Sequence, residues 1–243
     1  MTAPVLSLRG VGVNRREVPV VHDVSLDVAP GAVTVVLGAN GAGKTTLMDG
    51  IAGLAPVTSG TVQLDGWPIG KLPTYRRAQA GLGYVEQART VFRTLTVEQN
   101  LLVAGGDLGK VYDLFPELGN RRGLQAGHLS GGEQQMLALG RTLVSGPKVV
   151  LIDEMSLGLA PVVVRRLMDA VGDLVGLGIA VLLIEQFANL ALDIGTHAYV
   201  LRKGRVVHDG PCAELRGRSE RLHEFYFGLP PAPVAAAAES ETR

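Results

Sequence analysis

The stretch Gly38-Ala-Asn-Gly-Ala-Gly-Lys-Thr45 has the residue types and spacing that hold phosphate groups. It follows the apolar run 33–37 directly and opens a helix-like run that starts with Thr46. Glycines let successive N–H groups turn inward, and a helix N-terminus adds partial positive charge. In such a loop Lys44 reaches the β- and γ-phosphates and the Thr45 hydroxyl binds Mg²⁺. The predicted phosphate loop comprises Gly38, Ala39, Asn40, Gly41, Ala42, Gly43, Lys44, Thr45 and Thr46.

Two carboxylates end a second apolar run, where Asp153 and Glu154 follow residues 149–152. Asp153 is predicted to hold hydrated Mg²⁺. Glu154 is predicted to orient and deprotonate the water that attacks a γ-phosphate, a role worth roughly 10²–10⁴ in rate. An acidic pair at a strand end is by itself most often solvated. The presence of a phosphate loop in the same chain favours the catalytic interpretation of this pair.

A third motif, Leu129-Ser-Gly-Gly-Glu-Gln-Gln135, has two explanations. Ser130 and Glu133 have the spacing of a capping box, which satisfies free amides at a helix start. The capping box does not explain Gly131 and Gly132, because each glycine in a first helical turn costs about 1 kcal/mol relative to alanine. A phosphate that approaches the helix N-terminus explains both glycines.

Strands and helices predicted from periodicity place these motifs. The apolar runs 33–37, 149–152 and 179–184 are typical of parallel strands covered on both faces. Alternating segments at 5–10, 18–21, 24–28 and 60–66 predict an antiparallel sheet, and 197–209 predicts a closing hairpin. A helical region, about 88–145, lies between the two groups of strands. Residues 229–243, rich in Pro and Ala, are predicted to form a flexible tail.

Composition bounds the possible functions. The 243 residues carry 23 basic and 23 acidic side chains, so net charge gives no reason to expect a nucleic-acid partner. Cys212 is the single cysteine, which excludes an internal disulfide and a C-x-x-C site. No apolar run approaches the ~18–20 residues that span a bilayer. The N-terminus lacks the pattern of an export signal, so we expect a protein that neither crosses the membrane nor is exported.

Four motifs in this order resemble those of the ATP-binding cassette ATPases: 38–45 the P-loop, Gln87 the Q-loop, 129–135 the signature motif, and 152–154 the Walker B motif. The resemblance covers about residues 5–228. It implies an α/β P-loop NTPase core with an antiparallel β-subdomain and an inserted helical subdomain. The expected division is one ATPase domain over 1–228, which includes the helical subdomain, and the tail 229–243.

The resemblance also implies how the site is assembled. Two ATPase subunits would clamp two ATP molecules head to tail, so that Ser130, Gly131 and Gly132 contact the γ-phosphate held by the partner's P-loop. ATP and Mg²⁺ are the implied cofactors. Gln87 would take part in catalysis and join Thr45 and Asp153 around Mg²⁺.

Two further segments resemble a subfamily. Where most of the superfamily has S-A-L-D and a switch histidine, this chain has 156–161 (SLGLAP) and Glu185-Gln186. Both variants are similar to one ATPase subunit of bacterial branched-chain (hydrophobic) amino acid importers. Membership implies transmembrane permease subunits, a second ATPase subunit (another copy or a related chain) and, indirectly, an extracytoplasmic solute-binding protein. It implies a peripheral protein on the cytoplasmic face of the bacterial plasma membrane.

Three positions depart from the family pattern. Gln186 can hydrogen-bond the γ-phosphate or the water but cannot take a proton at neutral pH, which leaves Glu154 as the base. Arg15 stands where an aromatic residue stacks on adenine, with Val20 beside it, and a guanidinium also stacks on a base. Met155 replaces the usual proline, which frees a backbone angle and predicts a looser Glu154.

Three alternatives stay open at this point. A soluble cassette ATPase of translation or DNA repair usually has tandem cassettes or long coiled-coil insertions, and this chain has neither. A P-loop kinase or GTPase leaves 129–135 unexplained, and no N-K-x-D is present. A regulatory nucleotide-binding subunit with little turnover is suggested by Met155, Gln186 and Arg15.

Overall fold

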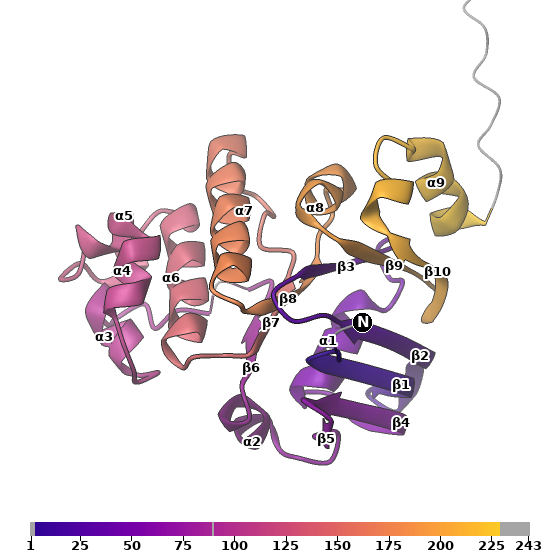
Figure 1. Ribbon diagram of the computed structural model, residues 1–243. Coiled ribbons are helices and arrows are strands. Elements are labelled where there is room, and N and C mark those ends of the chain that lie inside the picture. Colours follow the sequence, from indigo (N-terminus) through magenta and orange to yellow (C-terminus); the bar gives the residue numbers. More distant parts are fainter. Residues whose placement is uncertain (1–2, 89, 229–243) are drawn as a thin grey trace, which may run out of the picture.

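The computed structural model describes residues 3–88 and 90–228. A mixed sheet forms its centre (Figure 1), with strand order β10-β9-β3-β8-β7-β6. Every pair from β9 to β6 is parallel, and only β10 runs antiparallel to its neighbour. The strands are β3 (Val33–Leu37), β6 (Leu82–Val85), β7 (Val149–Asp153), β8 (Ala180–Ile184), β9 (His197–Arg202) and β10 (Arg205–Pro211).

The predicted parallel strands and the closing hairpin are confirmed, whereas β6 was not predicted. Its four residues include Gly83 and Tyr84, which interrupt the apolar run that marks the other core strands. β6 pairs with β7 and carries the chain toward Gln87. The missed strand therefore positions one of the predicted site residues.

The second sheet is antiparallel, as predicted, in the order β2-β1-β4-β5. Its strands are β1 (Leu6–Arg15), β2 (Val18–Val28), β4 (Val57–Leu64) and β5 (Trp67–Pro68). One continuous strand, β2, replaces the two predicted at 18–21 and 24–28. The pairing of β1 with β2 has register shifts around Val11 and Val13, and the β2 backbone is left-handed at Asp23, between the two predicted segments.

Helix α1 (Lys44–Ala52) lies between the two sheets. Its buried Leu47, Met48 and Ile51 join the inner face of the antiparallel sheet and one face of the mixed sheet in a single hydrophobic cluster. The other face of the mixed sheet packs on helices in a second cluster. Strands such as β3 contribute to both clusters, and all five residues of β3 are buried, with Thr34 as the one polar residue among them. This burial on both faces explains the continuous runs in the sequence.

Several of the remaining helices pack in the second cluster, on the face of the mixed sheet opposite α1. Between β6 and β7 the chain forms a helical group, which lies beside α7 in Figure 1. The helices are α2 (Thr74–Gln79), α3 (Val97–Leu102), α4 (Gly109–Leu114), α5 (Pro116–Gly119), α6 (Gly131–Val144), α7 (Pro161–Gly176), α8 (Ala188–Ile194) and α9 (Ser219–Phe227). The subdomain boundaries 88–145 stay a prediction, and the tail 229–243 lies outside the described residues.

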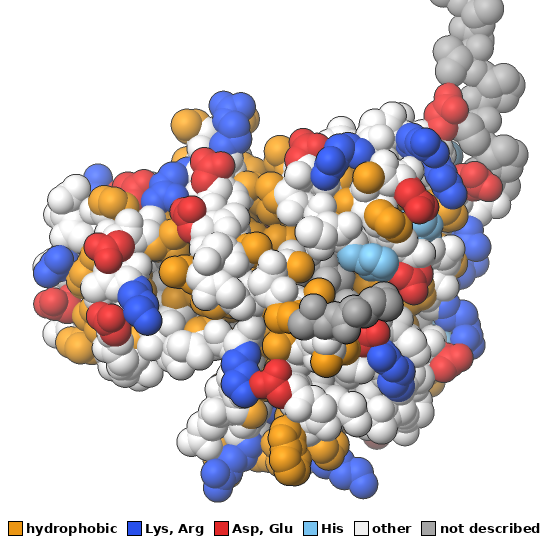
Figure 2. All heavy atoms as spheres, in the orientation of Figure 1, with side chains coloured by type: hydrophobic (Ala, Val, Ile, Leu, Met, Phe, Trp, Pro, Cys, Tyr) orange, Lys and Arg blue, Asp and Glu red, His pale blue; other side chains and the backbone are white. Residues whose placement is uncertain are grey.

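Acidic and basic side chains are interspersed on the face shown in Figure 2, in keeping with their equal numbers. Among residues 3–88 and 90–228, none of the helices combines the length and apolar character needed to cross a bilayer.

Candidate active site

The predicted phosphate loop connects the end of β3 to the start of α1. Its backbone is left-handed at Gly43, where φ is 104°, and this glycine precedes the first helical residue. At Gly38 a Cβ atom would lie 2.3 Å from the carbonyl oxygen of Leu201, so no side chain fits there. The turn before β10 supports the loop from outside, because Gly204 N–H donates to the carbonyl of Ala42 at 2.8 Å. The loop is therefore packed closely against Leu201 and hydrogen-bonded to the turn that follows it.

Lys44 is almost fully buried in this loop, at 5% exposed. Its ammonium donates to the carbonyls of Gly38 at 2.8 Å and Ala39 at 3.3 Å. It also lies 4.0 Å from Oε1 of Glu154. Burial lowers the pKa of Lys44, and the nearby Glu154 and Asp153 oppose that shift. The buried positive charge thus lies between the loop carbonyls and the two carboxylates.

The far end of α1 is fixed by Arg77, which the sequence analysis did not single out. Its buried guanidinium donates to the carbonyls of Gly50 at 2.7 Å and Ile51 at 2.6 Å. A cation at a helix C-terminus satisfies the last carbonyls and complements the helix dipole. Arg77 therefore stabilises the helix whose first residue is Lys44.

Asp153 is fully buried at the end of β7. Neither of its carboxylate oxygens has a hydrogen-bond partner of good geometry among the described residues. Burial raises the pKa of Asp153 to about 6, against the stabilising influence of the nearby Thr45 hydroxyl. A buried, unpartnered carboxylate beside a hydroxyl is the donor set that suits a hard divalent cation. The residues present therefore fit Mg²⁺, which commonly takes only one or two protein carboxylates alongside substrate phosphates.

Glu154 turns away from the strand toward the open side of the sheet. Its backbone is left-handed, with φ at 48°, and its N–H donates to the carbonyl of Ile184 at 2.9 Å. The Gln87 side-chain amide donates to Oε2 of Glu154 at 2.9 Å. Ile184 of β8 thus holds the backbone of Glu154, and Gln87 holds its carboxylate.

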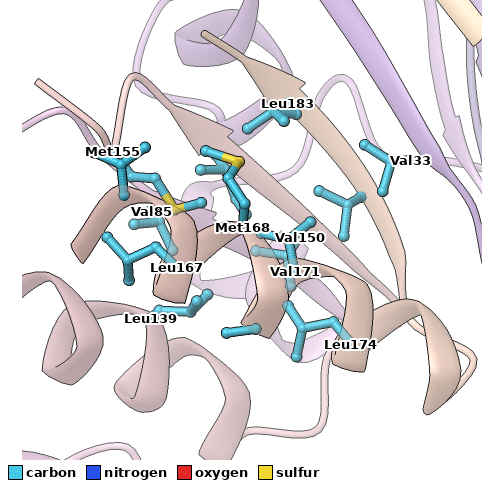
Figure 3. Packing of buried hydrophobic residues seen from close by; sticks show 14 of the residues in the cluster. Val33, Val85, Leu139, Val150, Met155, Leu167, Met168, Val171, Leu174 and Leu183 are labelled. Atoms are coloured by element: carbon cyan, nitrogen blue, oxygen red, sulfur yellow. The ribbon is translucent and has the colours of Figure 1, made fainter. Parts of the chain in front are cut away.

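Met155, expected to leave Glu154 looser, is buried at 2% exposed. Its side chain packs into the core near Val85 and Leu167 (Figure 3). Residue 155 is therefore held by apolar packing where the family has a ring-constrained backbone. The looser Glu154 expected from the loss of the proline stays a prediction, which the packing of the Met155 side chain in the core argues against.

An open cleft of about 490 Å³ brings most of the predicted residues together. Gln87 and Gln186 lie on its wall with Glu154, and Arg15 and Val20 line it as well. Leu157 also lines it and was not predicted, although it falls in the segment 156–161 that the sequence analysis singled out. The lining comprises Arg15, Val20, Asn40, Gly41, Gly43, Lys44, Thr45, Thr46, Gln87, Glu154, Leu157 and Gln186.

Ser130, Gly131 and Gly132 do not line this cleft. They stand at the start of α6, where Ser130 accepts from Glu133 N–H at 3.3 Å and Glu133 accepts from Ser130 N–H at 2.8 Å. The capping-box explanation of Ser130 and Glu133 is confirmed. Gly132 has a packing reason as well, because a Cβ there would lie 2.4 Å from Cγ1 of Val163. Contact of these residues with a partner's nucleotide stays a prediction.

Comparison with known proteins connects this geometry to named relatives. The family model described as "ABC transporter" matches residues 21–156. The branched-chain amino acid transport ATP-binding protein BraG of Pseudomonas aeruginosa is 39% identical over 92% of this chain and all of its own length. The probable branched-chain amino acid transport ATP-binding protein LivF of Archaeoglobus fulgidus is 39% identical over 91% of this chain and 99% of its own. The lipopolysaccharide export system ATP-binding protein LptB of Haemophilus influenzae is 32% identical over 92% of this chain and 97% of its own length.

Solved structures share the fold. A nucleotide-free ATP-binding cassette from an ABC transporter superposes with a TM-score of 0.84 at 24% identity, and covers 93% of this chain and 100% of its own. An ABC transporter cassette in its ADP conformation superposes with a TM-score of 0.83 at 25% identity, over 94% and 100%. The expected α/β core with two kinds of sheet is confirmed.

Proposed function

The chain belongs to the ABC transporter family, and we propose that it is the ATP-hydrolysing subunit of an importer for branched-chain or other hydrophobic amino acids. As a family member it is a transporter ATPase. The cargo, the partners, the metal and the residue roles form the proposal. One observation carries the chemistry: Lys44, Asp153, Glu154 and Gln87 converge at the end of the phosphate loop.

Two relatives named for branched-chain amino acid transport support the cargo, each 39% identical over more than nine-tenths of this chain. The segments 156–161 and 185–186 support it independently, since they resemble the same subfamily. The family also includes a lipopolysaccharide export ATPase at 32% identity, so the cargo has to be tested directly.

The proposed partners are transmembrane permease subunits, which supply the passage through the membrane. A second ATPase subunit completes the nucleotide sites, and a solute-binding protein delivers the cargo from outside. The chain then lies on the cytoplasmic face of the plasma membrane as a peripheral subunit. Closure of the ATPase pair around ATP moves the permease, so the nucleotide state sets its conformation.

In the proposed mechanism the loop amides and Lys44 bind the ATP phosphates. Thr45, Asp153 and Gln87 would hold Mg²⁺, which would supply charge neutralisation at the ATP phosphates. Glu154 takes the proton of the water that attacks the γ-phosphate. Ser130, Gly131 and Gly132 contact the γ-phosphate held by the partner subunit, which the position of α6 outside the cleft supports.

Gln186, which lines the same cleft as Glu154, orients the attacking water or the γ-phosphate. An amide donates and accepts hydrogen bonds but does not change its protonation near pH 7, so only Glu154 serves as base. Arg15 and Val20 receive the adenine ring, since both line the cleft that contains Lys44. The adenine contact is stacking by the Arg15 guanidinium and packing by Val20.

An uptake assay in right-side-out membrane vesicles loaded with ATP tests the cargo. It measures the ATP-dependent uptake of labelled leucine, isoleucine and valine. Vesicles from cells that contain the wild-type chain should accumulate the label, and Lys44→Ala should abolish uptake. Lys148→Ala is the matched control, because this exposed lysine pairs with Asp65 outside the cleft. Uptake that is indifferent to Lys44 would overturn the cargo proposal.

Purification of the chain from detergent-solubilised membranes tests the partners. Integral permease subunits and a second, related or identical ATPase should copurify. Recovery of ribosomes or DNA-repair factors would instead favour the soluble cassette ATPase. An assembled complex that binds ATP and hydrolyses none would favour the regulatory subunit with little turnover.

A further inference from the structure

Glu185 lies beside the proposed catalytic carboxylate but faces the opposite way. Strands β7 and β8 are parallel neighbours, with Asp153 opposite Ile184 in the register. Glu154 and Glu185 are therefore the residues that directly follow the ends of these two strands. Glu154 lines the cleft, whereas Glu185 is buried at 2% exposed and does not line it. A second carboxylate is thus enclosed at the end of the sheet, where water does not reach it.

Both oxygens of Glu185 are occupied by one residue. Ser156 donates its backbone N–H to Oε1 at 3.2 Å and its hydroxyl to Oε2 at 2.5 Å. Ser156 is itself 2% exposed. Burial raises the pKa of Glu185, and the two bonds from Ser156 oppose that shift. Among the described residues no lysine, arginine or histidine forms an ion pair with Glu185.

A buried carboxylate is a costly way to join two segments. Uncharged side chains can make the same connection without the cost of removing a charge from water. What the carboxylate adds is geometry: two acceptors in one plane, each bound to a separate donor of the same residue. The contact fixes both the position and the orientation of the backbone at residue 156.

The two residues that Glu185 joins each stand next to proposed chemistry. Ser156 follows Glu154 by two residues and precedes Leu157, which lines the cleft. Glu185 directly precedes Gln186, which lines the same cleft. Glu185 thus connects the segment that contains Gln186 to the turn that follows Glu154.

We propose that Glu185 is a positioning residue: by its two bonds to Ser156 it fixes Glu154 and Gln186 relative to each other for hydrolysis. The proposal rests on the proposed roles of Glu154 and Gln186. Glu185 touches neither nucleotide nor water. Its loss should slow hydrolysis and leave nucleotide binding in place, because the phosphate loop and Lys44 do not depend on it.

Three variants test the proposal in the assembled transporter. Glu185→Ala removes both bonds and should lower kcat 10- to 100-fold, while KM for ATP changes less than threefold. Glu185→Gln should recover most of the activity, since its amide oxygen accepts from the Ser156 N–H and its amide donates to the hydroxyl. Ser156→Ala, the milder change, should lower kcat less, and in the double variant with Glu185→Ala the two effects should not add.

A matched control and a readout independent of hydrolysis complete the design. Glu117→Ala removes a carboxylate that pairs with Arg166 away from the cleft, and should leave kcat unchanged. Hydrogen exchange of the isolated chain should show faster exchange of the Ser156 amide in Glu185→Ala, with the melting temperature recorded beside it. Wild-type kcat in Glu185→Ala, additive effects in the double variant, or unchanged exchange at Ser156 each overturns the proposal. If the Ser156 amide exchanges faster in Glu185→Ala but the assembled wild-type transporter hydrolyses no ATP, the result would count against the proposed function instead.

Discussion

The side-chain amide of Gln87 donates a 2.9 Å hydrogen bond to Oε2 of Glu154, across a chain separation of 67 residues. It connects the segment after β6 with the end of β7. The helical group follows that segment, so this bond is one link between the approach to the helical group and the proposed base. We therefore expect a movement of the helical group relative to the sheet to change the orientation of the Glu154 side chain.

Gln87→Leu removes this donor at nearly constant volume. Because Glu154 loses one of the elements that orient it, we expect kcat for ATP to fall about tenfold, at the low end of what a positioned base contributes. ATP affinity, measured with a fluorescent analogue, should stay within threefold of wild type. An unchanged kcat, or a loss confined to binding, would show that the hydrogen bond has no part in hydrolysis.

Asp153→Asn should stabilise the chain without nucleotide. The pKa of Asp153 is raised from 3.8 to about 6, so the ionised carboxylate costs stability above pH 6 and that cost disappears as the pH falls toward 4. A shift of about two pKa units corresponds to about 3 kcal/mol. The expected gain in melting temperature is roughly 6–12 °C at pH 7.5, about half of that at pH 5, and near zero below about pH 4.

The same variant should lose the stabilisation that Mg²⁺ adds to bound ATP, because the carboxylate that suits the cation is gone. Asp169→Asn, on the exposed side of α7, is the matched control for removing one negative charge. A melting temperature of Asp153→Asn that lies below wild type across the whole pH range would contradict the burial account of Asp153.

Much of the fold follows from periodicity, and the exceptions have physical reasons. Apolar runs predict β3, β7 and β8 because those strands are covered on both faces. Strand β6 is not predicted because Gly83 and Tyr84 interrupt the run of aliphatic residues that marks the other core strands. In the site, backbone-determined motifs such as the phosphate loop are visible in residue types. The buried roles of Arg77 and Glu185 cannot be predicted from residue type, because arginine and glutamate are ordinarily solvent-exposed and their burial depends on distant segments.

Gly132→Ala separates packing from phosphate approach. The new Cβ would lie 2.4 Å from Cγ1 of Val163, so we expect a loss of about 1–3 kcal/mol in stability from overpacking between α6 and α7. Val163→Ala in the same chain makes room and should restore the melting temperature. If the partner's nucleotide approaches this backbone, ATPase activity of the assembled pair should stay low in the double variant. Full recovery of activity would assign Gly132 to packing alone.

Met155→Ala tests whether apolar packing holds the residue after Glu154. Truncation of this buried side chain should cost about 2–5 kcal/mol in unfolding free energy and lower kcat as well. Met155→Leu keeps the volume and should cost less than about 1.5 kcal/mol, with kcat near wild type. Equal activity of the two variants would show that the position of Glu154 does not depend on the core beneath it.

The most direct test of the account is ATP turnover by the Glu154→Gln variant in the assembled transporter. The amide keeps the hydrogen-bonding shape and cannot take the proton of the attacking water. Steady-state hydrolysis should fall at least about 100-fold, while ATP stays bound and the ATPase pair remains closed, as size-exclusion chromatography with labelled ATP would show. Lys44→Ala should bind no ATP in the same assay. Turnover by Glu154→Gln at the wild-type rate would contradict the mechanism.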